Sequence, residues 1–234
     1  MKASEKIYEG KAKILYRTED PNLLIQYFKD DATAFNAQKK GTIQNKGVVN
    51  CAVSSVIFEF LETKGIKTHF VKKLDDRQML IKKVEIIPLE VVIRNYVAGS
   101  LAKRTGKPEG EKLPETLVEW YYKDDALGDP MVTKDHIRIF KLATNDEIAK
   151  VETLAKKVND LLVPYFEQRE ILLVDYKLEF GRHPEGILLA DEITPDGCRL
   201  WDAKTREKMD KDRFRFDLGK VEEGYKQIYE RVVG

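Results

Sequence analysis

The 234-residue sequence predicts an α+β fold with antiparallel strands first and helices and strands alternating later. In residues 6–29, short apolar runs alternate with turn residues, a pattern typical of β-hairpins. Apolar residues at helical spacing predict helices over 49–61 and 145–163. Residues 78–94 and 171–190 have strand composition. A chain of this length forms either one large domain or two lobes that share a cleft.

Composition and charge argue against several classes of protein. Apolar residues make up 42% of the chain, which is enough for a folded core. Charged residues make up 35%, yet the net charge is only +1, which argues against a nucleic-acid-binding or membrane-surface protein. The cysteines, Cys51 and Cys198, form no CxxC pair, and no apolar run is long enough for a signal peptide or a membrane span. We therefore expect a cytoplasmic protein.

Residues 171–193 contain the clearest chemical pattern. An apolar run is followed by charges on alternate residues, which a strand places on one face. A turn and a second apolar run then lead to two further carboxylates. The charged residues of this stretch are Asp175, Lys177, Glu179, Asp191 and Glu192. Carboxylates beside a lysine at strand ends can hold a divalent cation against a phosphate. The alternative is a solvated polar face on an edge hairpin.

The segment YEGKAK, residues 8–13, contains candidate phosphate-binding groups. Lys11 and Lys13 flank the small residue Ala12 just after Gly10. Because these small residues leave room, backbone amides and ammonium groups can approach a polyphosphate. Solvated lysines beside a turn are the alternative.

Residues 86–106 contain isolated charges within apolar strand sequence. Glu90 and Arg94 need a partner or a ligand there. We expect Ser100 to cap a short helix over 101–105. A helix N-terminus beside an arginine suits a phosphate, and a capped helix with a structural ion pair is the equal alternative.

Other segments are less informative. Residues 29–47 show no periodicity and are expected to form a functional or mobile loop. Residues 107–145 are expected to be an excursion from the core, with 124–132 as a lid or surface strap. No Walker A, GxGxxG, HExxH or GxSxG motif is present, and the histidines are not paired with a serine or cysteine nucleophile. Apolar spacing over 221–232 predicts a C-terminal helix.

Two long segments resemble the signature segments of one enzyme family. IIPLEVVIRNYVAGS (residues 86–100) and LVDYKLEFG (173–181) resemble the signatures of phosphoribosylaminoimidazole-succinocarboxamide synthase, the SAICAR synthetase family of purine synthesis. YEGKAK, DEITPDGCRLWD (191–202) and DKDRFR (210–215) also fit its pattern. The resemblance extends from residue 6 to the C-terminus.

The resemblance implies a reaction and an architecture. L-aspartate is joined to 5-amino-1-(5-phospho-D-ribosyl)imidazole-4-carboxylate (carboxyaminoimidazole ribonucleotide) through an acyl phosphate, with ATP converted to ADP and phosphate and Mg²⁺ as cofactor. The implied fold is two-lobed and kinase-like or ATP-grasp-like, with an antiparallel β-rich N-terminal lobe (1–88) and a larger C-terminal α/β lobe (89–234) around a central ATP cleft. It also implies a homodimer. A small-molecule kinase with the same ATP and Mg²⁺ apparatus is the alternative.

The resemblance also implies roles for individual residues. The residues expected to bind ATP are Lys11, Ala12, Lys13, Lys82, Val84 and Glu90, the last on the ribose after a strand over 79–87. The residues expected to bind the 5′-phosphate of the ribonucleotide are Arg94, Ser100 and Arg199. Mg²⁺ would be held by Glu179 and Asp191. Lys177 would stabilise charge on the transferring phosphoryl group, with Asp175 beside it orienting the substrate. Candidates for aspartate binding are Lys211, Arg215 and the loop over 30–47.

The proposed metal ligands conflict with the simplest hairpin. An antiparallel hairpin that turns near residues 182–184 places Asp191 opposite Asp175. Asp191 would then lie four residues, or about 13 Å at strand rise, from Glu179. That distance is too great for one ion to bridge. Either the segment bends after Lys177 or two ions are held.

Overall fold

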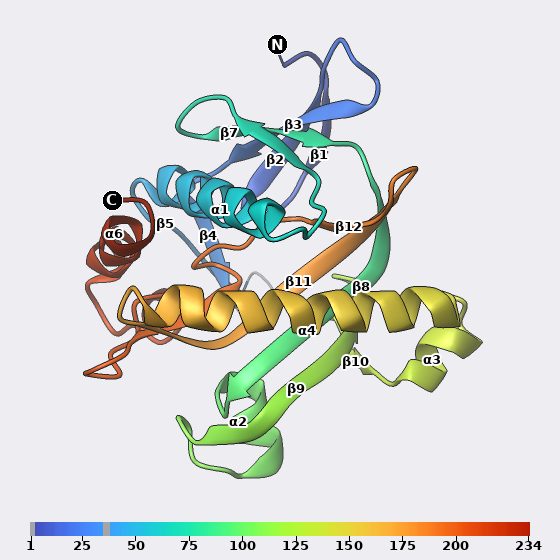
Figure 1. Ribbon diagram of the computed structural model, residues 1–234. Coiled ribbons are helices and arrows are strands. Elements are labelled where there is room, and N and C mark those ends of the chain that lie inside the picture. The colour runs from blue at the N-terminus through green and yellow to red at the C-terminus, as the bar shows by residue number, and fades with distance from the viewer. Residues whose placement is uncertain (1–2, 35–37) are drawn as a thin grey trace.

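The computed structural model describes residues 3–34 and 38–234, and its first main sheet has five antiparallel strands in the order β1-β2-β3-β7-β6 (Figure 1). Its strands are β1 (Lys6–Glu9), β2 (Lys13–Arg17), β3 (Leu23–Phe28), β6 (Phe70–Lys73) and β7 (Gln78–Lys82). The hairpin pattern predicted over 6–29 is confirmed by the antiparallel pairing of β1 with β2 and of β2 with β3.

The second main sheet has six strands and carries most of the charged residues predicted for the site. Its order is β10-β9-β8-β11-β12, and β13 pairs with β11. Its strands are β8 (Glu85–Tyr96), β9 (Lys112–Tyr122), β10 (Met131–Val132), β11 (Ile171–His183), β12 (Gly186–Ala190) and β13 (Cys198–Asp202). All these pairings are antiparallel. The chain is therefore a strand-rich mixed α/β protein, as predicted at the level of fold class.

Two segments expected to be loops contain strands. The excursion predicted over 107–145 is wrong for residues 112–122, because β9 pairs with β8 inside the second sheet and buries Trp120. In the segment 29–47, β4 (Asp31–Ala34) and β5 (Lys39–Thr42) form a separate two-stranded sheet. Residues 35–37 of that expected loop lie outside the described residues.

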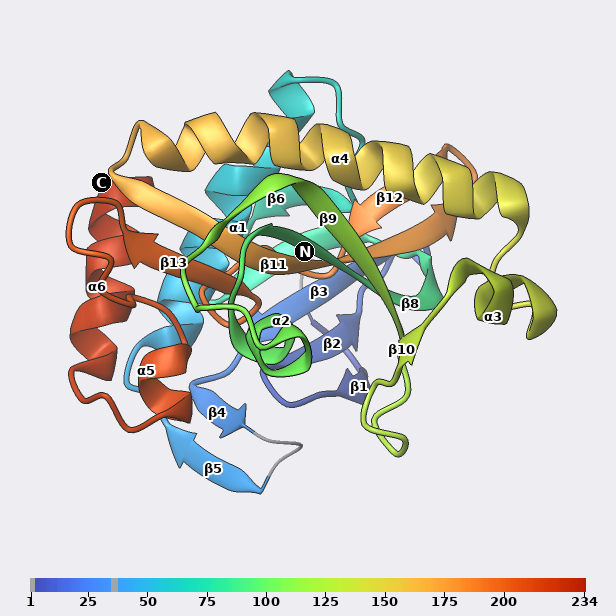
Figure 2. The same ribbon diagram turned by 90° about the horizontal axis from the view of Figure 1, so that it is seen from below.

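Each main sheet packs against a long helix (Figures 1 and 2). The helices of the chain are α1 (Lys46–Thr63), α2 (Gly99–Thr105), α3 (Lys134–Ile139), α4 (Asn145–Glu167), α5 (Asp212–Arg215) and α6 (Val221–Val232). Helix α1 contacts the first sheet and α4 crosses the second. The helices predicted over 49–61, 145–163 and 221–232 are confirmed, although α1 and α4 extend further than predicted. Thr144 and Glu147 form a capping box that fixes the start of α4.

The expected cap of α2 is wrong. Ala98 occupies the N-cap position and makes no side-chain capping bond, and the helix begins at Gly99. Ser100 Oγ instead accepts a hydrogen bond from Arg94 Nη2 at 2.9 Å. The serine hydroxyl is therefore used by the neighbouring guanidinium and not by the helix backbone.

The expected register of the hairpin that follows residue 171 is also wrong. Strand β11 continues to His183 and pairs it with Gly186, so Glu179 lies opposite Ala190. Asp191 follows directly after Ala190 and is close to Glu179 instead of four residues away. The turn is further along the chain than predicted, which removes the distance conflict between the two carboxylates.

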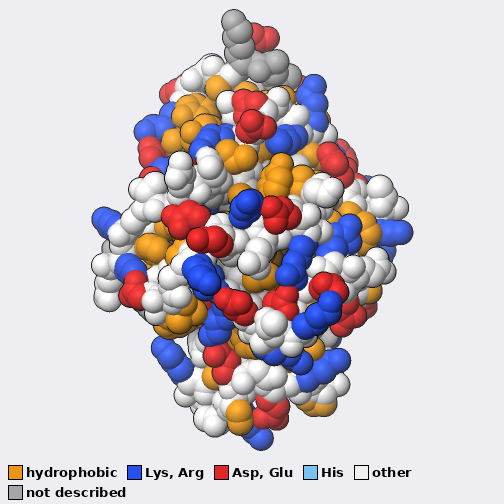
Figure 3. Space-filling view, turned by 90° about the vertical axis from the view of Figure 1, so that its left-hand side faces the viewer, with side chains coloured by type: hydrophobic (Ala, Val, Ile, Leu, Met, Phe, Trp, Pro, Cys, Tyr) orange, Lys and Arg blue, Asp and Glu red, His pale blue; other side chains and the backbone are white. Residues whose placement is uncertain are grey.

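The surface carries mixed charge. On the face drawn in Figure 3, basic and acidic side chains are interspersed, in agreement with the net charge of +1. No helix among the described residues is long and apolar enough to cross a membrane.

Candidate active site

The site is assembled where the chain crosses from β12 to β13. Strand β12 ends opposite Glu179, and β13 begins opposite Tyr176. Residues 191–197 therefore pass beside Lys177 in the middle of β11. Asp191 has a φ of 62°, a left-handed conformation that turns the chain as β12 ends. This turn brings the Asp191 carboxylate to the Lys177 ammonium.

The charged side chains at this crossing form a group that we call the lysine cluster: Lys13, Lys123, Lys177, Glu179 and Asp191. Lys177 Nζ lies 3.0 Å from Asp191 Oδ2 and also contacts Glu179. Lys13 of β2 pairs with Asp191, and Lys123 Nζ lies 2.9 Å from Glu179 Oε1. Three ammonium groups from different segments thus converge on two carboxylates.

Charge pairing keeps the centre of this cluster ionised. Burial opposes the charge of Glu179, but the ammonium groups, Lys177 foremost, lower its pKa to about 2. Burial lowers the pKa of Lys177, but Glu179 and Glu90 outweigh burial and hold that pKa above its ordinary value. Burial also lowers the pKa of Lys13, with Glu192 acting in the opposite direction. Lys177 and Glu179 are therefore both charged at neutral pH.

A cavity of about 240 Å³ lies between the first sheet and the lysine cluster. Its apolar lining includes Leu15, Leu24, Ile81, Val84 and Ile86. Its polar lining consists of Tyr8, Lys13, Gln26, His69, Lys82, Lys123, Glu179 and Asp191. An apolar slot that opens onto cations suits a ligand with a flat ring and an anionic tail.

The residues predicted to bind ATP do not all line this cavity. Lys13, Lys82 and Val84 do. Lys11 and Ala12 lie in the turn between β1 and β2, and Lys11 lines an adjoining hollow. The structure therefore brings part of the predicted set into one cavity and places the turn at its edge.

Glu90 has a different setting from the one expected. It lies within β8, directly opposite Glu179, and not after the end of a strand. Its Oε1 is 3.3 Å from Lys177 Nζ. Glu90 is thus a further anionic neighbour of the lysine cluster.

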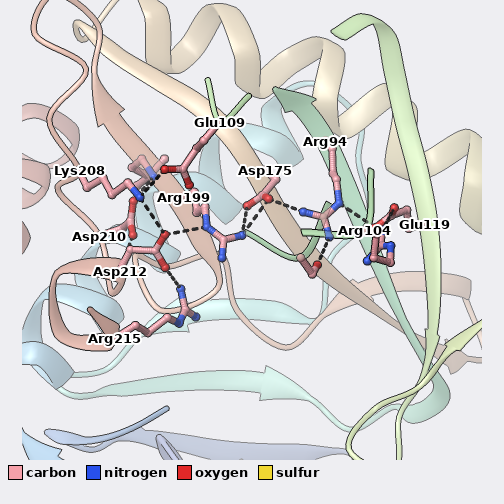
Figure 4. Close-up of polar contacts among 12 residues, drawn as sticks. Arg94, Arg104, Glu109, Glu119, Asp175, Arg199, Lys208, Asp210, Asp212 and Arg215 are labelled. Atoms are coloured by element: carbon pink, nitrogen blue, oxygen red, sulfur yellow. Dashed lines mark hydrogen bonds and ion pairs between the residues drawn. The ribbon is translucent and has the colours of Figure 1, made fainter. Parts of the chain in front are cut away.

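A second group of charges, which we call the arginine chain, consists in contact order of Glu119, Arg94, Asp175, Arg199 and Asp212 (Figure 4). Asp175 lies between the arginines, with its Oδ2 2.6 Å from Arg94 Nη1 and 2.9 Å from Arg199 Nη1. Arg94 Nε donates to Glu119 Oε2 at 2.7 Å. Arg199 Nε donates to Asp212 Oδ2 at 2.8 Å. Carboxylate and guanidinium therefore alternate across β9, β8, β11, β13 and α5.

The two arginines meet at the start of α2. Arg94 Nη2 donates to Ser100 Oγ at 2.9 Å. Arg199 Nη2 lies so close to Gly99 that a Cβ added there would be 2.4 Å away. Gly99 also has a φ of 54°, which glycine adopts without steric cost. Two guanidinium groups and a hydroxyl thus converge at one point, an arrangement that suits a phosphate.

Both arginines remain cations despite their burial. Burial lowers the pKa of Arg199, but Asp175 and Asp212 outweigh it and raise that pKa. The same balance applies to Arg94, where Asp175 and Glu119 raise the pKa against burial.

Glu179 and Asp191 fit a divalent cation together with other ligands. Both contact one ammonium, that of Lys177, so their oxygens converge on a single positive charge. Within residues 3–34 and 38–234, no group of three or more His, Cys, Asp or Glu side chains is arranged to hold a metal. Mg²⁺ is commonly held by one or two carboxylates together with phosphate oxygens and waters. The donor set is therefore suited to Mg²⁺ bound with a phosphorylated ligand.

The structure separates two residues that were expected to act together. Asp175 was expected beside Lys177, and both do lie on one face of β11. Asp175 nevertheless contacts Arg94 and Arg199, whereas Lys177 contacts carboxylates of the lysine cluster. The alternating charges of one strand thus serve two different groups.

Two of the candidates for aspartate binding, Lys211 and Arg215, lie at α5. Arg215 Nη1 donates to Asp212 Oδ1 at 2.6 Å. Lys211 Nζ lies 3.7 Å from Asp196 Oδ2, and burial lowers the pKa of Lys211. Both cations are near the end of the arginine chain.

Three charged residues of these groups were not predicted: Glu119, Lys123 and Asp212. The first two fall in the segment 107–145 that was expected to be an excursion. The β-branched and aromatic composition of residues 116–122 (TLVEWYY) is the strand signal that would have placed Glu119 in a sheet. Asp212 lies in a segment that fits the family pattern, but nothing in its spacing indicated a partner.

Comparisons with known proteins agree over nearly the whole chain. A family profile described as SAICAR synthetase matches residues 6–232. Phosphoribosylaminoimidazole-succinocarboxamide synthase from Caldanaerobacter subterraneus subsp. tengcongensis is 59% identical over 232 residues, covering 99% of each chain. The crystal structure of the synthase from Ehrlichia chaffeensis is 47% identical with a TM-score of 0.95, covering 97% of this chain and 98% of that chain. A SAICAR synthetase in complex with ADP is 51% identical with a TM-score of 0.94, covering 97% of each chain.

Proposed function

The chain belongs to the SAICAR synthetase family, and we propose that it joins L-aspartate to carboxyaminoimidazole ribonucleotide with ATP as the energy source. The products are SAICAR, ADP and phosphate. The supporting observation is the face of β11, which carries Asp175 in the arginine chain and Lys177 and Glu179 in the lysine cluster. One strand thus connects a cavity suited to a nucleotide with a site suited to a second phosphate.

The reaction needs an activated acyl group, because a carboxylate is a poor acyl donor at neutral pH. A carboxylate oxygen of the ribonucleotide forms a bond to the γ-phosphorus of ATP, and the bond from that phosphorus to ADP breaks. The aspartate amine then attacks the acyl carbon, the C–N bond forms, phosphate leaves with the bonding electrons and the amine loses a proton. Such a transfer depends mainly on positioning and on neutralising charge.

Lys177 is proposed to stabilise negative charge on the transferring phosphoryl group. It stands between Asp175 and Glu179 on one strand face, at the side of the lysine cluster next to the arginine chain. Its pKa is held high by carboxylates, so it is a cation throughout the working pH range. Asp175 is proposed to orient the ribonucleotide by fixing the two arginines around it.

ATP is proposed to bind in the cavity between the first sheet and the lysine cluster. The adenine occupies the apolar part, near Lys82 and Val84. Lys11, Ala12 and Lys13 form the turn and strand start that approach the phosphates. Tyr8 supports this placement, because it lines both the cavity and the hollow beside the turn.

Glu179 and Asp191 are proposed to hold Mg²⁺, and Glu90 to reach the nucleotide ribose. When bound, the ion neutralises phosphate charge. Glu90 is near enough to Lys177 to act on its ammonium as well, at 3.3 Å.

Arg94, Ser100 and Arg199 are proposed to bind the 5′-phosphate of the ribonucleotide. Their Nη2 and Oγ atoms meet at the start of α2, where Gly99 leaves room for the guanidinium of Arg199. Guanidinium forks match phosphate oxygens in pairs, which gives orientation as well as affinity.

We also propose an arrangement of two lobes, an oligomeric state and a cellular location. Residues 1–88, with the first sheet and α1, would form the N-terminal lobe of a kinase-like or ATP-grasp-like pair, and residues 89–234 the larger lobe. The cavity that residues of both sheets line would be the ATP cleft. We propose a cytoplasmic homodimer.

The test is a reconstituted reaction followed by mass spectrometry. The protein is incubated with ATP, Mg²⁺, L-aspartate and carboxyaminoimidazole ribonucleotide, and matched reactions omit one component each. We expect SAICAR and ADP only in the complete mixture. ADP formed equally without aspartate, together with a phosphorylated product, would establish a small-molecule kinase instead.

A further inference from the structure

We propose that Asp212 is a positioning residue for ribonucleotide binding, acting through Arg199. This inference rests on the proposed role of Arg199 in binding the 5′-phosphate. Asp212 is at the end of the arginine chain and, of the three residues proposed to bind the phosphate, contacts Arg199 (Figure 4). Its effect on the substrate is therefore indirect.

Among the described residues, the guanidinium of Arg199 is hydrogen-bonded to carboxylates through Nε and Nη1 but not through Nη2. Nε donates to Asp212 Oδ2 at 2.8 Å, and Nη1 donates to both oxygens of Asp175 at 2.9 and 3.0 Å. Nη2 makes no hydrogen bond to any described residue, and the guanidinium packs against Gly99, where a Cβ would lie 2.4 Å from Nη2 and 2.6 Å from Cζ. Because two carboxylates hold Nε and Nη1, the guanidinium has a fixed orientation beside Gly99, and Nη2 is left to bind a ligand. Arg94 is fixed in the same manner by Glu119 and Asp175.

Asp212 is itself held in a defined position. Its side chain is fully buried, with 0% exposure, and its other oxygen accepts from Arg215 Nη1 at 2.6 Å. Its backbone N–H donates to Asp210 Oδ1 at 2.8 Å, and Asp210 Oδ2 accepts from Leu200 N–H at 2.7 Å. The Asp210 carboxylate thus ties Asp212 to the residue that follows Arg199 on β13. The separation between Asp212 and Arg199 is set by this tie.

A buried carboxylate beside a phosphate site has two opposite effects, and they predict opposite results. Its charge repels the phosphate, so removal would strengthen binding. Its hydrogen bond holds the guanidinium, so removal would weaken binding. The geometry favours the second effect, because Asp212 holds the Nε edge of Arg199 while Nη2 is left without a hydrogen bond to any described residue. We therefore expect the loss of Asp212 to raise the KM for the ribonucleotide.

The test is Asp212→Asn, alone and combined with Arg199→Ala, with KM and kcat measured for each substrate. We expect the KM for the ribonucleotide to rise about tenfold, the size of one hydrogen bond to a charged group. The KM for ATP should change less than twofold. In the Arg199→Ala background, Asp212→Asn should have no further effect on the ribonucleotide KM, because the residue through which it acts is absent. Asp202→Asn is the matched control, since Asp202, the last residue of β13, also pairs with an arginine, Arg231, at 2.7 Å.

Each outcome decides the inference. An unchanged or lowered ribonucleotide KM, or an equal effect in the Arg199→Ala background, overturns it. A rise in Asp202→Asn of the same size also overturns it, because the effect would then be structural. If Asp212→Asn does not fold, Asp210→Asn, which loosens the backbone tie, is judged by the same measurements. A wild-type protein that makes no SAICAR contradicts the proposed function, and that result is independent of these variants.

Discussion

The lysine cluster and the arginine chain meet on one face of β11, yet they are built from different cations. Arg94 and Arg199 each bind two carboxylates through separate nitrogens. Lys177 has a single nitrogen that faces Glu90, Glu179 and Asp191 together. The Arg94 side chain is 3% exposed, whereas Lys123 and Lys177 are 38% and 26% exposed.

This difference between the cations matches two tasks, holding a substrate in one orientation and stabilising a group while it is transferred. A guanidinium fork has fixed geometry and keeps its partners in one orientation, whereas an ammonium on a flexible stem exchanges partners easily. The 5′-phosphate of the ribonucleotide is held and does not react, which suits the arginine chain. The phosphoryl group of ATP moves and its charge is redistributed, which suits the lysine cluster. The comparison therefore predicts that lysine variants alter turnover and arginine variants alter substrate binding.

The largest effect is expected from Lys177→Ala. Loss of a cation that acts mainly in the transition state should reduce kcat by about 100-fold or more. ATP binding, measured by calorimetry, should change little, because Lys13 and Lys123 remain in the cavity lining. Weakened ATP binding with unaltered turnover per bound nucleotide would contradict this role.

Arg199→Ala should produce the next largest effect, and this effect should be on substrate binding and not on turnover. The KM for the ribonucleotide should rise roughly 10- to 100-fold, as expected for hydrogen bonds between charged groups. The KM for ATP should be nearly unchanged, because Arg199 does not line the cavity proposed to bind ATP. Arg199→Lys should restore little, because an ammonium cannot bind Asp175 and Asp212 in the way a fork does. Equal effects on both KM values would refute the separation between the two groups.

Local patterns in the sequence were enough to predict α1, α4 and α6 and to find the charged face of β11, but they missed β4, β5 and β9. The alternation of Asp175, Lys177 and Glu179 required only the period of a strand. The partners of these side chains could not be predicted in the same way, because they depend on register. The Glu179–Asp191 distance was misjudged because the turn lies at residues 184–185 and not at 182–184. A shift of this size changes which side chains meet across a hairpin.

Long-range partners were the other part that could not be predicted. Glu119 meets Arg94 because β9 pairs with β8 in one register, and Asp212 meets Arg199 because Asp210 ties α5 to β13. No local spacing encodes these contacts. Of the residues proposed to bind the phosphate, Arg94 and Ser100 were singled out from local sequence and Arg199 from the family resemblance, and their convergence near Gly99 became visible only in three dimensions.

Gly99→Ala tests the convergence itself, with a smaller expected effect. An alanine Cβ would lie 2.4 Å from Arg199 Nη2 and would displace the guanidinium. The ribonucleotide KM should rise by about tenfold, and the positive φ of Gly99 should cost about 1–2 kcal/mol of stability. Gly106→Ala is the matched control: it also has a positive φ, but a Cβ there meets nothing within 4 Å. We expect Gly106→Ala to lose similar stability while its ribonucleotide KM stays at the wild-type value.

The smallest effect is expected from His69, whose imidazole is buried near the lysine cluster. It is an effect on stability and not on activity. Burial and the charge of Lys13 lower the pKa of His69 from 6.5 to about 3. Between those pH values the unfolded chain binds a proton at this position and the folded chain does not. The contribution of His69 to stability is therefore complete above pH 6.5 and is lost as the pH falls towards 3, by at most about 1.4 kcal/mol per pH unit.

Urea denaturation of His69→Gln at pH 7.5 and at pH 5 isolates this contribution. The variant should lose less stability between the two pH values than the wild type, because glutamine does not titrate. Carboxylates with lowered pKa, such as Glu179, act in the same direction and remain in both proteins, so part of the acid sensitivity should persist. An identical loss in the variant and the wild type would show that His69 takes up its proton equally in both states. The lysine cluster would then tolerate a charged imidazole near Lys13. The contrast between the lysine cluster and the arginine chain would be weaker than the geometry indicates.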